Sequence, residues 1–181
     1  MLLDAAGKIL RKRGTTLSFE AMAEAADVSA TLPYKYFDSV DDVALELYQR
    51  FVRAIDDATD QLLADPDADF DTKVRGGMDL WFDAIRRDGS LLLRLTGSDA
   101  PSGLQRSVEQ RRRRVTKLWA HEVAEEFGLE PEDAGLAAAA LIAATSAVLQ
   151  RCRVERLDRH EVTEKYVRMV RAMCEAAGPT D

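Results

Sequence analysis

A short segment, DVSATLPYKYF from Asp27 to Phe37, brings together side chains that suit contact with nucleic acid. It carries hydroxyl groups first and then an ammonium group between two phenols. Such groups donate hydrogen bonds to phosphate oxygens, and a tyrosine ring can pack on a thymine methyl group. The segment therefore indicates a DNA-contacting surface. Its candidate contact residues, with one serine just upstream, are Ser18, Ser29, Thr31, Leu32, Tyr34, Lys35 and Tyr36.

Two short helices are needed to position this surface. Ser18 is a good N-cap for a helix that runs to Ala25, and a tight break follows at Asp27-Val28. Ser29 can cap a further short helix that ends near Phe37. Two short helices joined by a turn of three or four residues describe a helix-turn-helix, in which the first helix braces the second. The predicted brace consists of Phe19, Met22, Ala23 and Val28.

The rest of the chain has helical rather than alternating periodicity, so the predicted fold is all-α with about nine helices. Ser39 begins a capping-box pattern that opens a long helix reaching Leu62. The other helices are predicted over 2–13, which stops at Gly14, and over 71–87, 90–95, 104–127, 132–155 and 158–176. Asp158 is expected to cap the last of these.

Composition restricts the class of protein. The 181 residues are 46% hydrophobic and 31% charged, which is typical of a soluble domain with a substantial core. No apolar leader is visible, the run Gly135–Leu149 looks too short and alanine-rich for a membrane span, and the two cysteines form no framework. A cytoplasmic location is expected. The net charge of −7 means that any basic DNA footprint must be local.

Enzyme chemistry finds little support in the sequence. The two histidines, His121 and His160, lie at no metal-ligand spacing with a second His or Cys. No nucleophile elbow, phosphate loop or dinucleotide fingerprint occurs. No catalytic residue, metal site or cofactor is therefore expected.

From LLDAAGKILRKRG through LSFEAMAEAADVS to TLPYKYFDSVDDV, the sequence resembles the N-terminal domain of TetR-family (tetracycline-repressor-like) transcriptional regulators. The matching elements are Ala5-Ala6, Gly14, Met22-Ala23, Val28-Ser29, Tyr34-x-Tyr36-Phe37 and Ser39. The resemblance implies a DNA-binding domain over 1–46 and a helical effector-binding and dimerisation domain over 47–178. It further implies a homodimer, formed through the last two helices, that binds a palindromic operator in double-stranded DNA. The implied function is that of a repressor, which an unknown small-molecule effector releases from DNA.

Departures from the family pattern at Asp27, at Val40 and at Pro33, together with an acidic charge balance, affect the DNA-binding expectation. Asp27 stands where the family usually has Gly, and aspartate tolerates the left-handed conformation that this turn needs. Val40, followed by two aspartates, replaces the usual Lys at the start of the fourth helix. Residues 1–46 carry eight acidic against five basic side chains, a net charge of −3.

Pro33 is the third departure. If Ser29 caps the helix, Pro33 removes its first backbone hydrogen bond and pushes Leu32 from helical angles. The alternative is a helix that starts late, with Pro33 at its favoured first position. For Tyr36, a DNA contact and a second arrangement are both open: in the second, its ring packs against the first helix while its hydroxyl reaches a phosphate.

The helical body offers candidate effector-binding residues. Trp81 and Trp119 lie on long helices beside other large side chains, and they form either a plain core or the wall of an apolar cavity. On the helix bearing QRRRRV, Arg111 or Arg112 must point inward, to pair with a carboxylate such as Asp79 or Asp83 or to clamp an anionic effector. The candidates are Met78, Trp81, Phe82, Arg111, Arg112, Val115 and Trp119.

The last two helices are predicted to form the dimer interface. The segment from Glu132 to Leu149 is apolar nearly all round, so it must be covered on more than one side. The final helix adds a broad apolar surface from Val162 to Met173. Together they suit a symmetric four-helix contact between two copies. The alternative function is a helical homodimer that binds a small molecule or protein partner but not specific DNA.

Overall fold

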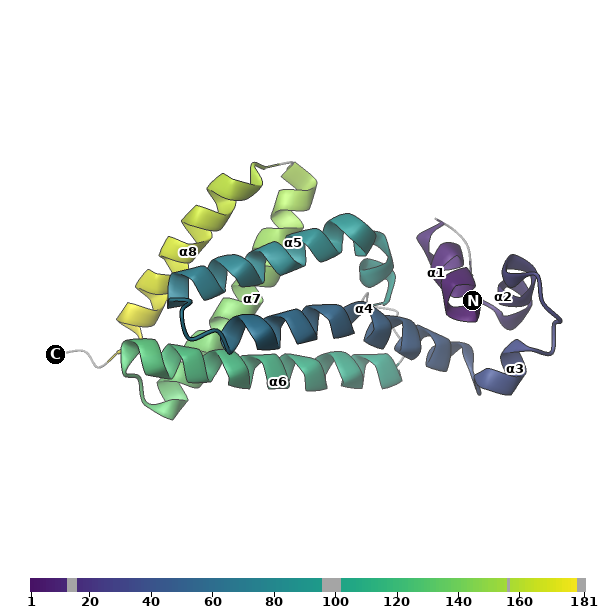
Figure 1. The fold of residues 1–181 in the computed structure, drawn as a ribbon, viewed down its shortest axis with the longest axis horizontal. Helices are drawn as coiled ribbons and strands as arrows, with labels where there is room; N and C mark the ends of the chain where they lie inside the picture. Colours follow the sequence, from purple (N-terminus) through teal and green to yellow (C-terminus); the bar gives the residue numbers. More distant parts are fainter. Residues whose placement is uncertain (13–15, 96–101, 156, 179–181) are drawn as a thin grey trace. The chain divides into compact units, whose positions relative to one another are not determined.

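The computed structural model describes residues 1–12, 16–95, 102–155 and 157–178. In these ranges the chain forms eight helices and no strand, which confirms the all-α prediction (Figure 1). The helices are α1 (Leu2–Arg11), α2 (Phe19–Ala26), α3 (Pro33–Tyr36), α4 (Val40–Leu63), α5 (Phe70–Leu95), α6 (Ser102–Phe127), α7 (Pro131–Glu155) and α8 (Arg159–Ala176).

Most helix ends lie within a few residues of the predicted ones, and the caps explain why. Ser39 accepts a hydrogen bond from the Asp42 amide at 3.1 Å before α4, and Asp158 accepts one from the Glu161 amide at 2.8 Å before α8. The predicted stop at Gly14 lies outside the described residues. The break predicted between 71–87 and 90–95 is confirmed: α5 is two helices joined across a kink at Asp88 (φ −154°, ψ 32°), and they share one label.

Packing divides the chain into two units. The first, here called the head unit, consists of Met1–Ile55 and Ala84–Gln110, and the second, the body unit, of Asp56–Asp83 and Arg111–Asp181. The predicted boundary at residue 46 follows the helix-turn-helix motif rather than these units, and it stays a prediction.

The head unit has a core to which five helices contribute. Buried apolar side chains of α1, α2 and α4 pack with the end of α5 and the start of α6. The predicted brace is part of this core, since Phe19, Met22 and Ala23 are buried and Val28 packs against it. Arg11 of α1 also forms a two-point ion pair with Asp88, the residue at the break in α5. The helix-turn-helix is therefore held by a larger set of elements than the first 46 residues.

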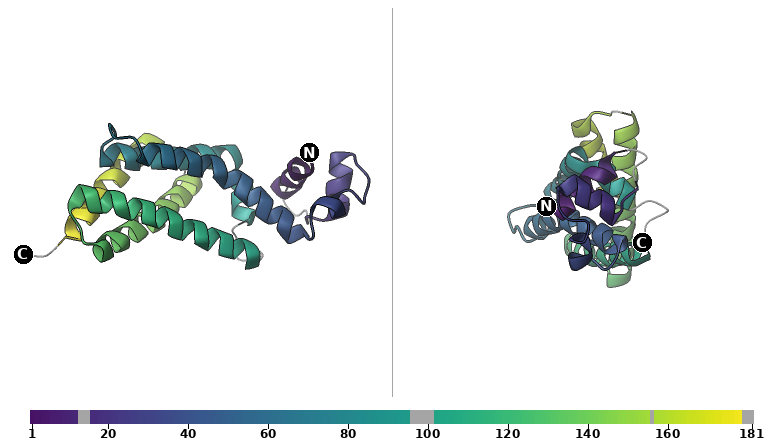
Figure 2. Two further views of the ribbon diagram at one scale, coloured as in Figure 1. Left: turned by 60° about the horizontal axis from the view of Figure 1, so that its bottom comes forward. Right: turned by 90° about the vertical axis from the view of Figure 1, so that its right-hand side faces the viewer.

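In the body unit, ion pairs and a buried hydrogen bond connect neighbouring helices. Asp56 pairs with Arg111 and Asp60 pairs with Arg114, so α4 and α6 run in the same direction here (Figure 2). α8 returns along α7, where the Tyr166 hydroxyl donates to the Leu141 carbonyl at 2.8 Å (Figure 1).

The helix α7 is apolar, yet the single chain leaves most of its surface uncovered. Its segment Pro131–Cys152 is 22 residues long with a mean hydropathy of 1.4, so its length and composition would allow a membrane span. The Gly135–Leu149 run is part of this longer helix, and a single helix of this kind is weak evidence for a membrane span, because the core helix of a soluble protein has the same length and composition. Only 28% of its most apolar stretch is buried within the chain.

Candidate functional site

The turn between α2 and α3 has the geometry that the sequence predicts. Asp27 adopts the left-handed conformation (φ 53°, ψ 52°), its amide donates to the Glu24 carbonyl at 3.2 Å, and the Val28 amide donates to the Ala23 carbonyl at 3.0 Å. These two bonds make a Schellman motif, which ordinarily uses glycine at this position. The aspartate therefore preserves the turn, and it places an exposed carboxylate there.

Pro33 is accommodated at the start of α3 rather than inside it. It occupies the first helical position, so the late-start alternative is confirmed. The Leu32 amide donates to the Ser29 carbonyl at 2.9 Å, which forms a turn that leads into the helix. Leu32 nevertheless keeps helical angles (φ −65°, ψ −45°), so the expected displacement was wrong: this turn outweighs the usual bias before proline.

The segment from Ser29 to Tyr36 presents most of the candidate contact residues to solvent. Ser29, Thr31, Tyr34, Lys35 and Tyr36 are exposed, whereas Leu32 is half-buried against the head core. Tyr36 is 70% exposed, which agrees with its outward option and not with packing on α1. The two hydroxyls of Ser29 and Thr31 lie 3.3 Å apart. The short helix thus gathers hydroxyl, phenol and ammonium groups on one exposed segment.

Ser18 has a different position from the other candidates. Its hydroxyl caps α2 by accepting a hydrogen bond from the Ala21 amide at 3.1 Å, and the residue is half-buried. It therefore fixes the start of the bracing helix, and its hydroxyl donates to the Glu20 carboxylate, a bond that contributes to the lowered pKa of Glu20.

Tyr34 is tied to the bracing helix by two contacts. Its hydroxyl donates to Glu20 Oε1 at 2.9 Å, and its ring meets the ring of Phe19 edge-on, with centroids 4.6 Å apart. The hydrogen bond to Glu20 raises the pKa of Tyr34. The pKa of Glu20 is lowered, first by its own backbone amide and then by Tyr34. Sequence reasoning counted Glu20 only as a charge, although its place in the first turn of α2 was a usable signal.

The candidate effector residues divide into buried and half-buried ones. Met78, Val115 and Trp119 are buried in the body unit. A Cβ atom placed on Gly77 would lie 3.3 Å from Trp119 Cζ2, so this indole packs directly against the α5 backbone. Trp81 and Phe82 are half-buried, and a guanidinium group covers a ring of each: Arg111 at 5.2 Å from the Trp81 centroid and Arg159 at 5.1 Å from that of Phe82.

Arg111 is the inward-pointing arginine of the QRRRRV run. Its Nε and Nη2 both donate to Asp56 Oδ1, at 2.8 and 2.5 Å, whereas Arg112 is exposed. An internal pair was one of the two expectations, but the named partners were wrong. Arg159 from α8 pairs with both Asp79 and Asp83, at 2.7 and 2.8 Å. Periodicity identified the inward face of α6 but not which helix lies opposite it.

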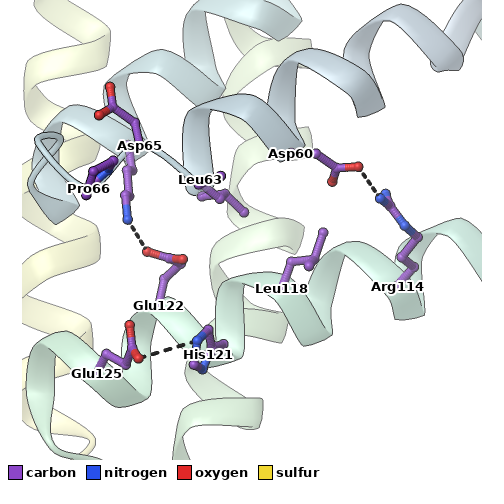
Figure 3. Close-up of a pocket in the computed structure, with 11 residues that line it drawn as sticks. Asp60, Leu63, Asp65, Pro66, Arg114, Leu118, His121, Glu122 and Glu125 are labelled. Atoms are coloured by element: carbon purple, nitrogen blue, oxygen red, sulfur yellow. Dashed lines mark hydrogen bonds and ion pairs between the residues drawn. The ribbon is translucent and has the colours of Figure 1, made fainter.

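A groove of about 550 Å³ lies in the body unit among α4, α5 and α6 (Figure 3). Leu63 and Leu118 lie between two ion pairs, Asp60 with Arg114 at 2.5 Å and Lys73 with Glu122 at 2.6 Å. None of the candidate effector residues lines it. The lining residues are Asp60, Leu63, Ala64, Asp65, Pro66, Lys73, Arg114, Leu118, His121, Glu122 and Glu125. No sequence pattern indicates this groove, because its walls come from three separate helices.

Comparison with known proteins supports one fold. Neither a model of a protein family nor a curated protein matches the sequence. Among solved structures, a TetR-like transcriptional regulator from Rhodococcus sp. RHA1 is similar, with a TM-score of 0.73, 23% identity and coverage of 93% of this chain and 91% of that one. A tetR-family transcriptional regulator from Streptomyces coelicolor has a TM-score of 0.74 and 18% identity over 97% of this chain and 79% of the other.

A TetR transcriptional regulator from Legionella pneumophila is also similar, with a TM-score of 0.71 and 15% identity, and the match covers 98% of this chain and 95% of that one. These matches span nearly the whole chain, including the part beyond residue 47 where the sequence showed no family motif. The resemblance noted in the sequence is confirmed for the fold: the chain is folded as TetR-like transcriptional regulators are.

Proposed function

We propose that this protein is a transcriptional regulator that binds a palindromic operator in double-stranded DNA as a homodimer. The observation that carries the proposal is the exposed Ser29–Tyr36 segment, held by a helix-turn-helix within a TetR-like fold. The contact residues are Ser18, Ser29, Thr31, Leu32, Tyr34, Lys35 and Tyr36, with Lys35 on a phosphate. Repression is the proposed mode, and the cytoplasm the proposed location.

DNA binding through this surface has to rely on the few groups that contact the DNA, because the net charge of the domain does not attract it. Lys35 is the one basic side chain between Thr16 and Tyr48, and the first 46 residues have a net charge of −3. Counterion release then supplies less affinity than in a strongly basic domain, and hydrogen bonds and base contacts supply more. We therefore expect weak binding to arbitrary DNA.

The proposed homodimer uses α7 and α8. Leu136 of α7 is 72% exposed and Met169 of α8 is 65% exposed, although both helices bury other apolar residues within the chain. Ala143 and Ala147 are exposed at helical spacing from Leu136. A second copy would cover these residues by a symmetric four-helix contact, which also accounts for the low burial of α7.

An effector site in the body unit completes the proposal. The candidate residues Met78, Trp81, Phe82, Arg111, Arg112, Val115 and Trp119 remain our choice for its wall. Since Arg111 and Arg159 cover the rings of Trp81 and Phe82, an effector that stacks on either ring has to displace a paired guanidinium. Effector binding would release DNA by shifting the dimer toward a state in which its two helix-turn-helix motifs no longer fit their half-sites.

The second candidate function is a helical homodimer that binds a small molecule or a protein partner without binding specific DNA. The acidic excess of the first 46 residues favours it, because phosphate contacts dominate the affinity of most DNA-binding domains.

Selection from a pool of random duplexes separates the two candidates. A DNA-binding homodimer should enrich a two-fold symmetric sequence whose half-site centres lie about one helical turn, roughly 34–36 Å, or a multiple of it apart. If folded protein enriches no sequence over repeated rounds, the second candidate is favoured.

A further inference from the structure

The exposed hydroxyl of Tyr34 is already committed within the chain. It donates to Glu20 Oε1 at 2.9 Å, while the edge-on contact with Phe19, which is only 6% exposed, fixes the ring. A phenol has one hydroxyl proton, and a phosphate oxygen can only accept. While Glu20 holds this proton, Tyr34 presents lone pairs to an approaching phosphate, and the encounter is repulsive.

The backbone amides in the first turn of α2 are the second set of donors that could bind a phosphate here, and the Glu20 carboxylate already accepts from one of them. Glu20 is the second residue of α2, after Ser18 as the N-cap and Phe19, and its own backbone amide bonds its carboxylate and lowers its pKa. The first turn of a helix favours an anion because its amide groups lack helical partners. In this protein the anion is a side chain of the same helix.

We propose that Glu20 is a built-in competitor for DNA phosphate, which sets the affinity of the Ser29–Tyr36 surface by holding the Tyr34 hydroxyl and the first turn of α2. The inference rests on the proposed DNA binding. Phosphate contacts supply the affinity for arbitrary DNA, so an internal anion weakens that part of the binding most. A specific operator compensates for this loss of affinity through base contacts that arbitrary DNA does not make. Glu20 therefore widens the difference in affinity between the operator and arbitrary DNA, and that difference is the specificity.

The test compares Glu20→Gln with Glu24→Gln. Both substitutions remove one negative charge from an exposed position on α2, one helical turn apart. The amide that Glu20→Gln introduces can donate to the Tyr34 oxygen, which leaves the Tyr34 hydroxyl proton for a phosphate. Fluorescence anisotropy would give Kd for a selected duplex and a scrambled duplex between 50 and 200 mM salt. Circular dichroism would check that each variant is folded.

Glu20→Gln should tighten binding to both duplexes, and more for the scrambled one. Removing a carboxylate from beside the phosphates should steepen the plot of log K against log salt by up to about 0.9. The affinity ratio of variant to wild type would then fall about three- to fourfold between the two salt concentrations. Glu24→Gln should leave the slope unchanged. Tyr34→Phe in the Glu20→Gln background should remove most of the gain, because the freed hydroxyl is what gains the phosphate.

The outcomes separate this inference from the proposed function. Wild-type binding to the selected duplex with no gain in Glu20→Gln overturns the inference alone. Equal gains in Glu20→Gln and Glu24→Gln also overturn it, since net charge would then suffice. Weaker binding by Glu20→Gln would show that Glu20 itself contacts a base, as an acceptor from cytosine, and would overturn it too. Failure of wild type and variant to bind any duplex overturns both proposals.

Discussion

Trp119 of α6 packs against the backbone of α5 at Gly77, where a Cβ atom would lie 3.3 Å from Cζ2 of the indole. Trp119 is 4% exposed, and it also meets Phe70 edge-on at 6.3 Å between ring centroids. The adjacent Gly76 leaves similar room, since a Cβ there would lie 2.8 Å from two methyl carbons of Leu62. The Gly76-Gly77 pair thus lets α4 and α6 approach α5 closely in the body unit.

Gly77→Leu should therefore destabilise the protein. The larger side chain overpacks a site that holds a buried indole, which costs about 1–3 kcal/mol in the free energy of unfolding. Chemical denaturation followed by circular dichroism measures this loss. Gly135→Ala in α7 is the control: nothing lies within 4 Å of its Cβ position, so it should be neutral or gain up to about 1 kcal/mol. Equal effects of the two substitutions would contradict the close packing.

Pro33→Ala should also destabilise the protein, although proline is the residue that ordinarily breaks helices. Pro33 occupies the first position of α3, where its missing amide costs no helical hydrogen bond, and its ring is fully buried. Alanine loses that packing and adds freedom to the unfolded chain, a combined loss of about 1–2 kcal/mol. Urea unfolding gives the value. A variant as stable as wild type, or more stable, would contradict a stabilising role of Pro33 in the head unit.

Because Tyr166 is buried, the stability of the protein should fall at alkaline pH. Burial raises its pKa to about 12, from 10.0 in the unfolded chain. Below pH 10 both states keep the proton, but between 10 and 12 the unfolded state ionises first, so the unfolding free energy of wild type falls as pH rises. The fall attributable to this residue is on the order of 2 kcal/mol.

Tyr166→Phe isolates that contribution. At pH 9 the variant should be less stable by about 1 kcal/mol, because the hydroxyl no longer bonds the Leu141 carbonyl. Toward pH 12 the difference should shrink or reverse, since Phe does not ionise. Denaturation at a series of pH values measures it, and a difference that stays constant from pH 9 to 12 would contradict the assigned pKa.

Leu136→Asp should convert the proposed dimer into a monomer. Leu136 is 72% exposed in the single chain, so the substitution leaves the monomer's core intact while it buries a charge in the proposed interface. Light scattering after size exclusion should give the 20.1 kDa chain mass for the variant and twice that mass for wild type. Gln61→Asp, also exposed but on α4, should remain dimeric. A monomeric wild type, or a dimeric Leu136→Asp, would remove α7 from the interface.

The sequence predicted those features that depend on neighbouring residues. Ser18, Ser39 and Asp158 cap helices as their types and spacing indicated, and Asp27 takes the left-handed turn. The late start of α3 at Pro33 was one of the two alternatives that the same local rules left open. The break between the helices predicted over 71–87 and 90–95 is likewise confirmed by the kink at Asp88.

Contacts between distant segments could not be predicted in the same way. The period of α6 showed that an arginine points inward, but only the fold shows that Asp56, 55 residues away, is its partner. The bond between Tyr34 and Glu20 likewise depends on how α2 and α3 pack. Such pairs depend on helix packing angles, which a hydrophobic pattern does not specify.

The most direct test of DNA binding is fluorescence anisotropy of the full chain with the selected symmetric duplex and a scrambled duplex, across a salt series. Tyr34→Ala/Lys35→Ala serves as the variant. We predict binding to the symmetric duplex at least about 10³-fold tighter than to the scrambled one, weakening linearly in log salt and lost in the variant. Equal affinity of folded, dimeric protein for both duplexes would contradict the account and favour a dimer that binds other partners.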